Sequence, residues 1–470
     1  MTSTADNRLG TVPIRRLLFQ MAVPTVLAQL VNLLYNIVDR MYVGRIEGSG
    51  SLALAGLGVT FPITILIAGF SALVGMGGAP RAAIAMGEKN YKAAQKIMGN
   101  CVTLLLLFSA VLSVGFMISR DWILLTFGAS EKTLPYASDY ISIYLVGTVF
   151  VQMAFGLNMF ITNQGFAKTS MATVCIGAVL NIILDPLFIF GFHMGVKGAA
   201  WATVISQAVS ALWVVGFLCS KKSVLKIRLK DMKLSGRVVG SILSLGVSPF
   251  VMQATECLIQ LTFNHGMLRY GNDLYVALMS ILFSLTQVIW MPLQGFAQGA
   301  QPIIGYNYGA GDLSRVRQTF KLLFRVSLGF SLLIILAVEC FPTAFLHLFS
   351  SDPELMAIGK NTTRVFLLGM AVMGAQSACQ QTFLALGQAK ISVFLAMLRK
   401  VILLWPLALL LPRLAGLGLW GLFMAEPISD VIASVTTTIT FFLFSRRRLY
   451  HPAAAPAVSA KHNALREDQA

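Results

Sequence analysis

Residues 101–118 read CVTLLLLFSAVLSVGFMI, an uninterrupted run of 18 residues without a charged side chain. A run of this length is typical of a helix that crosses the hydrocarbon core of a membrane. Of the 470 residues in the chain, 56% are hydrophobic and 12% are charged, whereas soluble domains carry about 25% charged residues. The composition argues against a soluble enzyme and predicts an all-α polytopic membrane protein. Continuous apolar runs also differ from the alternating pattern of a transmembrane β-barrel.

Similar apolar runs recur along the chain and predict twelve membrane spans. They are expected near 17–43, 52–80, 94–118, 136–162, 168–190, 197–219, 239–265, 275–302, 318–340, 360–384, 391–411 and 419–444. Lys and Arg concentrate in loops that stay in the cytoplasm. With the N-terminus inside, 25 of the 36 Lys and Arg lie on the cytoplasmic side, nine lie outside and two lie within span 11. We therefore expect both termini in the cytoplasm.

The formal net charge of +17 has a simple explanation in such a protein. Basic cytoplasmic loops face anionic lipid headgroups, so we expect membrane lipid, and not nucleic acid, as a partner. The six cysteines lie in or at the ends of apolar runs without a C-x-x-C pair, which predicts neither disulfides nor a zinc site. No G-x-x-x-x-G-K-[ST] loop is present, so we expect no ATP hydrolysis and no cofactor besides a coupling ion.

An internal repeat divides the chain into two halves. Pairs of residues recur with an offset of 222: Gly77 and Gly299, Pro80 and Pro302, Gly87 and Gly309, Gly165 and Gly387, Lys168 and Lys390, Ser170 and Ser392. Six spans in each half insert both halves the same way up, which predicts parallel repeats and indicates a transporter that handles its substrate between them. The expected parts are an N-tail (1–16), a first lobe (17–219), a linker (220–238), a second lobe (239–444) and a C-tail (445–470).

Spans 1 and 7 each carry a strip of polar side chains. The strips are Gln29, Asn32, Asn36 and Asp39 in span 1, and Gln253, Glu256, Gln260 and Asn264 in span 7. Spacings of three and four residues place each strip on one helical face. Such residues line a cavity or form hydrogen bonds that only pack the bundle. We predict a substrate cavity lined by Asn32, Tyr35, Asn36, Gln253, Glu256 and Gln260.

Acidic residues inside spans are candidates for an ion site, because an acid at the centre of a span costs about 2.5–3.5 kcal/mol on insertion scales. Asn181 and Asp185 lie four residues apart in span 5, while Asp39 and Thr203 lie in the outer parts of spans 1 and 6. Their oxygens could hold a hard cation such as Na⁺. Alternatively, two close carboxylates cannot easily both ionise and would share a proton. The residues themselves leave both alternatives open.

A second group of intramembrane charges lies near the end of the chain. Glu426 and Asp430 lie four residues apart in span 12, and Arg399 and Lys400 lie in span 11. Charges inside a membrane usually pair or face a cavity. We predict a structural charge pairing between these two spans.

Three motifs resemble those of the MATE (multidrug and toxic compound extrusion) transporters. They are Pro24-x10-Tyr35-Asn36-x2-Asp39-x3-Val43-Gly44-Arg45, Gln298-Gly-Ala-Gln-Pro302-Ile-Ile-Gly-Tyr-Asn307-Tyr-Gly-Ala-Gly311, and Gly165-x2-Lys168 followed by Asn181-x3-Asp185-Pro186. The resemblance covers about residues 15–445 and is closest to the bacterial MepA-like branch, near the DinF-like proteins. It implies twelve transmembrane helices in two pseudo-symmetric six-helix lobes around a V-shaped central cavity.

The resemblance also implies a function and an ion site. MATE transporters expel organic, often cationic drugs in exchange for Na⁺ or H⁺, here across a bacterial inner membrane. The first-lobe ion site of DinF-like members matches Asp39, Asn181, Asp185 and Thr203, with Asn158 as a weaker match. NorM-like members use acids in spans 7 and 10; Glu256 matches the first, but 360–384 contains no acid. We therefore expect coupling through the first lobe, with Na⁺ or H⁺ at Asp39, Asn181, Asp185 and Thr203, in a monomer.

Two other functions compete with drug export. A lipid-linked oligosaccharide flippase shares this superfamily fold, but its cavity should carry several cations for a pyrophosphate. The chain has Arg399 and Lys400, but no such cluster in spans 1, 2, 7 and 8. A membrane enzyme would need a clustered His, Asp or metal constellation, and the sequence shows none. We expect a transporter and not an enzyme.

Overall fold

The structure is a computed structural model that describes residues 4–46, 50–349, 352–414 and 416–450. Over these residues it contains helices and loops and no strand, so the predicted all-α fold is confirmed. The helices are α1 (Thr4–Thr11), α2 (Ile14–Gly44), α3 (Gly50–Gly87), α4 (Tyr91–Ile118), α5 (Arg120–Thr126), α6 (Leu134–Val146), α7 (Thr148–Asn163), α8 (Ala167–Pro186), η1 (Leu187–Gly191), α9 (Val196–Cys219), η2 (Leu229–Asp231), α10 (Gly236–Tyr270), α11 (Asp273–Gly309), α12 (Leu313–Cys340), α13 (Pro342–His347), α14 (Pro353–Leu367), α15 (Met370–Ala385), α16 (Ala389–Met397), η3 (Leu398–Leu404), α17 (Trp405–Leu410), η4 (Leu411–Arg413), α18 (Gly418–Ser445) and η5 (Arg446–Tyr450).

Up to eleven of these segments are long and apolar enough to cross a membrane. Ten are single helices or helices continued by short π or 3-10 turns, and the eleventh is the pair α6 and α7, which bends by 58°. The expected span 360–384 is the exception within the described residues. It is divided between α14 and α15, and α14 carries Lys360 and Arg364. This segment is therefore helical but is not one continuous apolar span.

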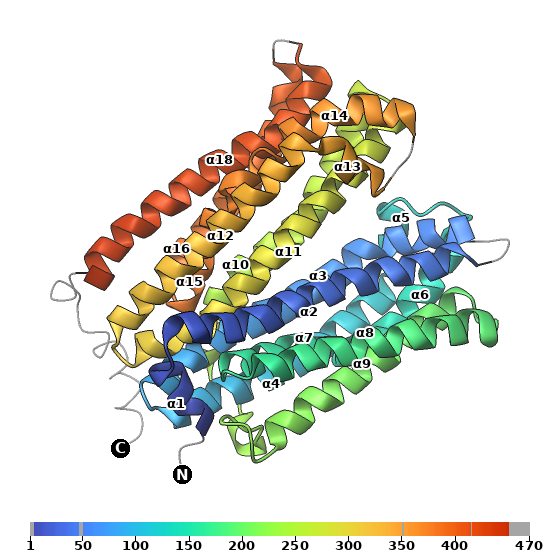
Figure 1. Cartoon of the computed structure of the whole chain (residues 1–470). Helices are drawn as coiled ribbons and strands as arrows, with labels where there is room; N and C mark the ends of the chain where they lie inside the picture. The colour runs from blue at the N-terminus through green and yellow to red at the C-terminus, as the bar shows by residue number, and fades with distance from the viewer. Residues whose placement is uncertain (1–3, 47–49, 350–351, 415, 451–470) are drawn as a thin grey trace.

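The helices form two bundles that touch at one end and diverge toward the other (Figure 1). We call α2–α9 the N-lobe and α10–α18 the C-lobe. Across the boundary, α2 packs on α11, and α3 packs on α10 and α11. The contact lies at the end where α1 lies (Figure 1). Loop 220–235, which carries five Lys and one Arg, also lies there, since it bonds to Gln95 and Asn100 near the start of α4. We therefore call this end the basic end, and the opposite end the far end.

Glycines permit the close contact between the lobes, and they do so symmetrically. A Cβ atom at Gly87 of α3 would overlap the carbonyl oxygen of Tyr306 on α11. A Cβ atom at Gly309 of α11 would overlap the carbonyl oxygen of Ile84 on α3. Gly309 and Tyr306 follow Gly87 and Ile84 by 222 residues. The contact between the lobes thus follows the offset of the internal repeat.

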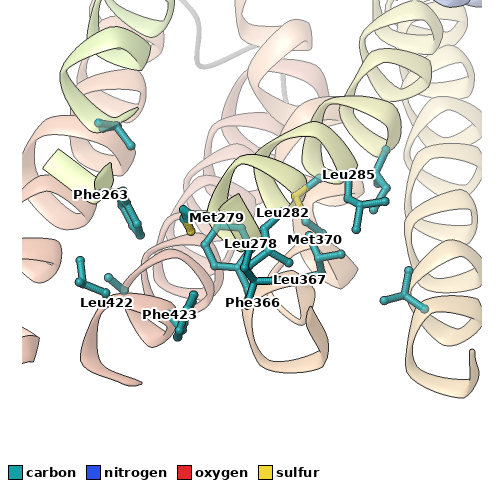
Figure 2. Packing of buried hydrophobic residues seen from close by; sticks show 14 of the residues in the cluster. Phe263, Leu278, Met279, Leu282, Leu285, Phe366, Leu367, Met370, Leu422 and Phe423 are labelled. Atoms are coloured by element: carbon teal, nitrogen blue, oxygen red, sulfur yellow. The ribbon is translucent and has the colours of Figure 1, made fainter. Parts of the chain in front are cut away.

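Each lobe has its own apolar core. In the C-lobe, buried side chains of α10, α11, α14, α15 and α18 pack together (Figure 2), and the rings of Phe263 and Phe366 meet edge to face at 6.3 Å. In the N-lobe, buried clusters include side chains of α3, α4 and α7 and of α3, α6 and α9. Large apolar side chains such as Val114, Leu336 and Leu443 are exposed, as expected for helices that face lipid.

The beginning of the chain is fixed to the C-lobe. The expected N-tail includes α1, and α2 already begins at Ile14. The carbonyl oxygen of Leu9 accepts hydrogen bonds from Asn307 and Arg315, each at 3.0 Å, and Arg315 also donates to Val12 O at 2.8 Å. These bonds hold α1 at the basic end. Of the expected C-tail, residues 451–470 lie outside the described residues.

Candidate functional site

Four side chains that were expected to form an ion site come together in the N-lobe, and we call them the carboxylate site. Asp39 lies near the end of α2, Asn181 and Asp185 near the end of α8, and Thr203 in α9. The carboxyl groups of Asp39 and Asp185 are neighbours in this site. Asn181 Nδ2 donates to Asp185 Oδ1 at 3.3 Å and to Thr203 Oγ1 at 3.4 Å. The amide of Asn181 therefore links the carboxyl group of Asp185 to the hydroxyl group of Thr203 on the neighbouring helix.

The local sequence explains why α8 and α9 approach each other here. Pro186 follows Asp185, and the chain continues as the π-helical turn η1. Gly195, with φ of +55°, precedes α9. A Cβ atom at Gly198 would lie 2.7 Å from the carbonyl carbon of Phe188. The small residues at the start of α9 thus allow close packing against the end of α8, which places Thr203 beside Asn181.

The carboxylate site is buried and retains unused oxygen atoms. Asp185 is fully buried, and Asp39 exposes 8% of its surface. Asp39 Oδ1, Asn181 Oδ1 and Asp185 Oδ2 have no hydrogen-bond partner within the described part of the chain. Among the described residues, no Lys or Arg forms an ion pair with either carboxyl group.

Buried oxygens without partners are unfavourable, and their arrangement indicates what would satisfy them. Na⁺ prefers oxygen ligands, and two adjacent carboxyl groups can share a proton. The donor set therefore fits a small cation in either form.

Tyrosines enclose the carboxylate site. Tyr35 of α2 and Tyr140 of α6 both lie next to Thr203. The rings of Tyr140 and Tyr144 stack with their centroids 6.1 Å apart. Tyr140 and Tyr144 were not expected in this site. Their spacing of four residues in span 4 is the sequence signal that places both on one helical face.

A pocket adjoins the carboxylate site within the N-lobe. It contains about 470 Å³ of empty space that includes open solvent, and Asn181 and Thr203 form part of its wall. Asn32 and Tyr35, expected at the substrate cavity, also line it, as does Asn158. The other lining residues are Ala154, Phe155, Thr173, Val174, Gly177, Ala178, Ser206, Gln207 and Ser210.

Asn158 lies beside this pocket on α7. Its Nδ2 donates to the carbonyl oxygen of Ser170 at 3.3 Å, while its Oδ1 is buried without a partner in the described residues. The side-chain hydrogen bond of Asn158 thus leads to the first turn of α8 and not to the two carboxyl groups.

The six residues expected to line one substrate cavity lie on α2 of the N-lobe and α10 of the C-lobe. Asn32 and Tyr35 line the N-lobe pocket, and Asn36 is exposed, with its Nδ2 2.6 Å from the carbonyl oxygen of Asn32. Gln253 is exposed and Gln260 is half-buried on α10 of the C-lobe. Helical spacing predicts which residues share a face of one helix, but it does not predict how far apart the residues of two different helices lie.

Five charged side chains meet inside the C-lobe. Arg399 Nε lies 2.8 Å from Asp430 Oδ1, and Arg399 Nη2 lies 3.6 Å from Glu426 Oε1. The predicted pairing between spans 11 and 12 is therefore confirmed for Arg399. It is wrong for Lys400, whose Nζ lies 3.0 Å from Oε2 of Glu256 on α10. Because Arg399 contacts both acids of α18, the neighbouring lysine pairs with a different helix.

The chain resembles known proteins over most of its length. The family profile MatE matches residues 24–187 and 249–410, one segment in each lobe. Multidrug export protein MepA of Staphylococcus haemolyticus is 26% identical over 415 residues, which are 88% of this chain and 90% of that protein. Multidrug export protein MepA of Staphylococcus aureus is 24% identical over 424 residues, which are 90% and 93% of the two chains. A crystal structure of MATE in the bent conformation superposes with a TM-score of 0.89 at 21% identity, covering 97% of this chain and 100% of the other.

Proposed function

The chain belongs to the MATE family of multidrug efflux transporters, and we propose that it exports organic, often cationic compounds in exchange for H⁺ or Na⁺. The observation that carries this proposal is the carboxylate site beside the N-lobe pocket. Two buried carboxyl groups retain unpartnered oxygens, and Asn181 and Thr203 belong both to the carboxylate site and to the wall of the pocket.

Helix α2 offers a physical connection between ion and substrate. It carries Asp39 of the carboxylate site, Asn32 and Tyr35 of the pocket wall, and Thr25 at the contact between the lobes. A cation that neutralises charge at Asp39 and Asp185 therefore acts on the helix that also holds the substrate and the other lobe. Uptake of the cation from outside favours release of the drug, and binding of the drug from inside favours release of the cation.

Alternating access requires that the lobes open first at one end and then at the other. In the structure the lobes touch at the basic end and diverge toward the far end (Figure 1). With the basic end in the cytoplasm, this arrangement is the outward-facing state. The driving force is sufficient, because one charge moving through 100 mV contributes about 2.3 kcal/mol, or roughly a 50-fold gradient.

The proposal also covers the cellular location and the oligomeric state of the protein. The apolar helices make it a multi-pass membrane protein, and we place it in the bacterial inner membrane with both termini in the cytoplasm. We propose that it acts as a monomer, contacts membrane lipid and no nucleic acid, and needs no cofactor besides the coupling ion.

A flippase for lipid-linked oligosaccharides is not favoured. The curated relatives reported above are named multidrug export proteins. The two cations that could bind a pyrophosphate, Arg399 and Lys400, are already paired with carboxylates in the C-lobe. The proposed activity is transport and not enzymatic turnover, in line with these relatives.

Ethidium efflux from vesicles that contain the purified protein tests the proposal. Na⁺ and pH gradients are imposed separately on the wild type and on Asp39→Asn. We expect one gradient to drive efflux by the wild type and neither to drive it in the variant, because the variant lacks one of the two carboxyl groups.

Asp139→Asn is the matched control, since Asp139 is a partly exposed carboxylate of the same lobe, 3.4 Å from Lys197. It should transport like the wild type. Full efflux by Asp39→Asn with unchanged ion dependence would contradict the ion site. Absence of ion-driven efflux of a panel of organic cations by the wild type would contradict the proposed function.

A further inference from the structure

The charges of the five residues that cluster inside the C-lobe do not sum to zero. Glu256, Glu426 and Asp430 supply three carboxyl groups, whereas Arg399 and Lys400 supply two cations. Arg399 is shared by Asp430 and Glu426, and Lys400 is bound to Glu256. Glu426 Oε2 and Asp430 Oδ2 are buried and have no hydrogen-bond partner among the described residues. The cluster can therefore accommodate one additional positive charge.

Glu256 is the member of this cluster that faces open space. Its side chain is 32% exposed, compared with 8% for Lys400 and 6% for Glu426. Gln253, three residues earlier on the same face of α10, lies next to Gly69 of the N-lobe helix α3. This face is thus turned toward the other lobe. Glu256 continues this face of α10 three residues after Gln253, so its partly exposed side chain lies on the side of α10 that faces the N-lobe.

Lys400 has a second carboxylate nearby. It belongs to the π-helical segment η3, and such segments are frequent at functional sites. Its ammonium group sits on a flexible four-carbon stem. The preceding residue, Arg399, lies 3.6 Å from Glu426 Oε1, and Glu426 Oε2 has no partner among the described residues. Arg399, in contrast, is held by two carboxylates and by the ring of Trp290, whose centroid is 5.6 Å from the guanidinium carbon. Lys400 is therefore the cation of the pair that can change partners.

We propose that Lys400 is an internal counter-cation that a cationic substrate displaces from Glu256. The positive charge of the substrate pairs with Glu256 between the lobes, and Lys400 Nζ moves to Oε2 of Glu426. The added charge then balances the cluster. An uncharged substrate leaves the pair between Lys400 and Glu256 intact. This inference rests on the proposed export function and makes the C-lobe selective for monovalent organic cations.

Two probes of similar shape test the inference on the full-length purified protein. Tetraphenylphosphonium carries one positive charge, and triphenylphosphine oxide is uncharged. Glu256→Gln should weaken binding of the cation at least tenfold and leave binding of the neutral probe unchanged. Lys400→Met should tighten binding of the cation several-fold, because the internal competitor is absent. Glu426→Gln should weaken binding of the cation, because Lys400 then lacks its second partner.

Glu339→Gln is the control variant, since Glu339 is a glutamate of α12 that lies 3.7 Å from Arg364, outside this cluster. It should bind both probes like the wild type. Equal loss of both probes in Glu256→Gln, or weaker binding of the cation by Lys400→Met, would overturn the inference and indicate a purely structural ion pair.

A double variant covers the case in which a single variant fails to fold, because removal of one partner leaves a buried charge unpaired. Glu256→Gln/Lys400→Met removes both charges and should lose the preference for the cation. A preference equal to that of the wild type would overturn the inference. Ion-driven efflux by the wild type is measured separately, so failure of the export function is distinguishable from failure of this exchange.

Discussion

Thr25 Oγ1 lies 2.6 Å from the carbonyl oxygen of Gly295 and donates a hydrogen bond across the boundary between the two lobes. Thr25→Val removes this bond, and a typical net contribution is about 0.5–1.5 kcal/mol. We expect the population of states that are open at the basic end to rise roughly two- to tenfold. Distances between spin labels at the exposed residues Lys168 and Lys390, one in each lobe, would measure this shift.

Thr60→Val serves as the control for this experiment. Thr60 is also buried, but its hydroxyl group donates to Leu57 of its own helix at 2.8 Å. The distances between the spin labels in Thr60→Val should match those in the wild type. An unchanged distribution in Thr25→Val would show that the bond to Gly295 contributes little to the closed basic end.

Gly299 controls how closely α11 approaches α2. A Cβ atom at Gly299 would lie 2.5 Å from the Cα atom of Ala22, so Gly299→Ala must separate the two helices. Overpacking of this kind typically costs about 1–3 kcal/mol. We expect a shift away from the closed basic end and slower ethidium efflux.

Gly329→Ala is the matched substitution, because a Cβ atom at Gly329 of α12 meets nothing within 4 Å. Since alanine is the better helix former, this variant should keep its stability and its transport rate. Equal transport by the two variants would argue against a required close contact at Gly299.

The N-lobe pocket should respond to changes in its volume. Val174 lines it, and Val174→Phe would fill part of the space. We expect bulky substrates to be exported on the order of tenfold more slowly, by analogy with the cost of overpacking, while small substrates are less affected. Val179 lies on the same helix and is 55% exposed, so Val179→Phe should transport normally. The two efflux rates, compared over a size series of cations, decide whether substrates use this pocket.

Arg399 should be important for stability. It is buried between Asp430 and Glu426, so Arg399→Met leaves two buried carboxylates without their cation. Breaking a buried pair in this way typically costs about 3–5 kcal/mol. We expect a clearly lower melting temperature in detergent, with partial recovery in Arg399→Met/Asp430→Asn. A melting temperature equal to that of the wild type would show that the pair is not needed for folding.

Much of the fold follows from patterns within single helices. The apolar runs predicted nearly all spans, and spacing of four residues placed Asn181 and Asp185 on one face, where the structure has them. The offset of 222 residues is repeated in the contacts of Gly87 and Gly309. In these cases the sequence pattern lies within a single helix or is repeated in the second half of the chain.

The remaining features depend on how helices pack and could not be predicted in the same way. Lys400 lies in the π-helical segment η3 and pairs with Glu256 of α10, a contact between helices that spacing along one helix does not predict. Tyr140 joins Thr203 only after α6 and α9 pack together. The break between α14 and α15 interrupts a segment whose composition alone predicted one span.

The absence of a basic ion-pair partner for Asp39 and Asp185 among the described residues has an electrical consequence. With the proposed uptake of one monovalent cation, the net charge of the carboxylate site would change by one unit. When access to such a site switches from one side of the membrane to the other, that charge experiences the transmembrane voltage. The membrane potential would therefore bias the empty and the loaded transporter to different degrees, because a negative interior opposes inward exposure of the loaded site less than that of the more negative empty site.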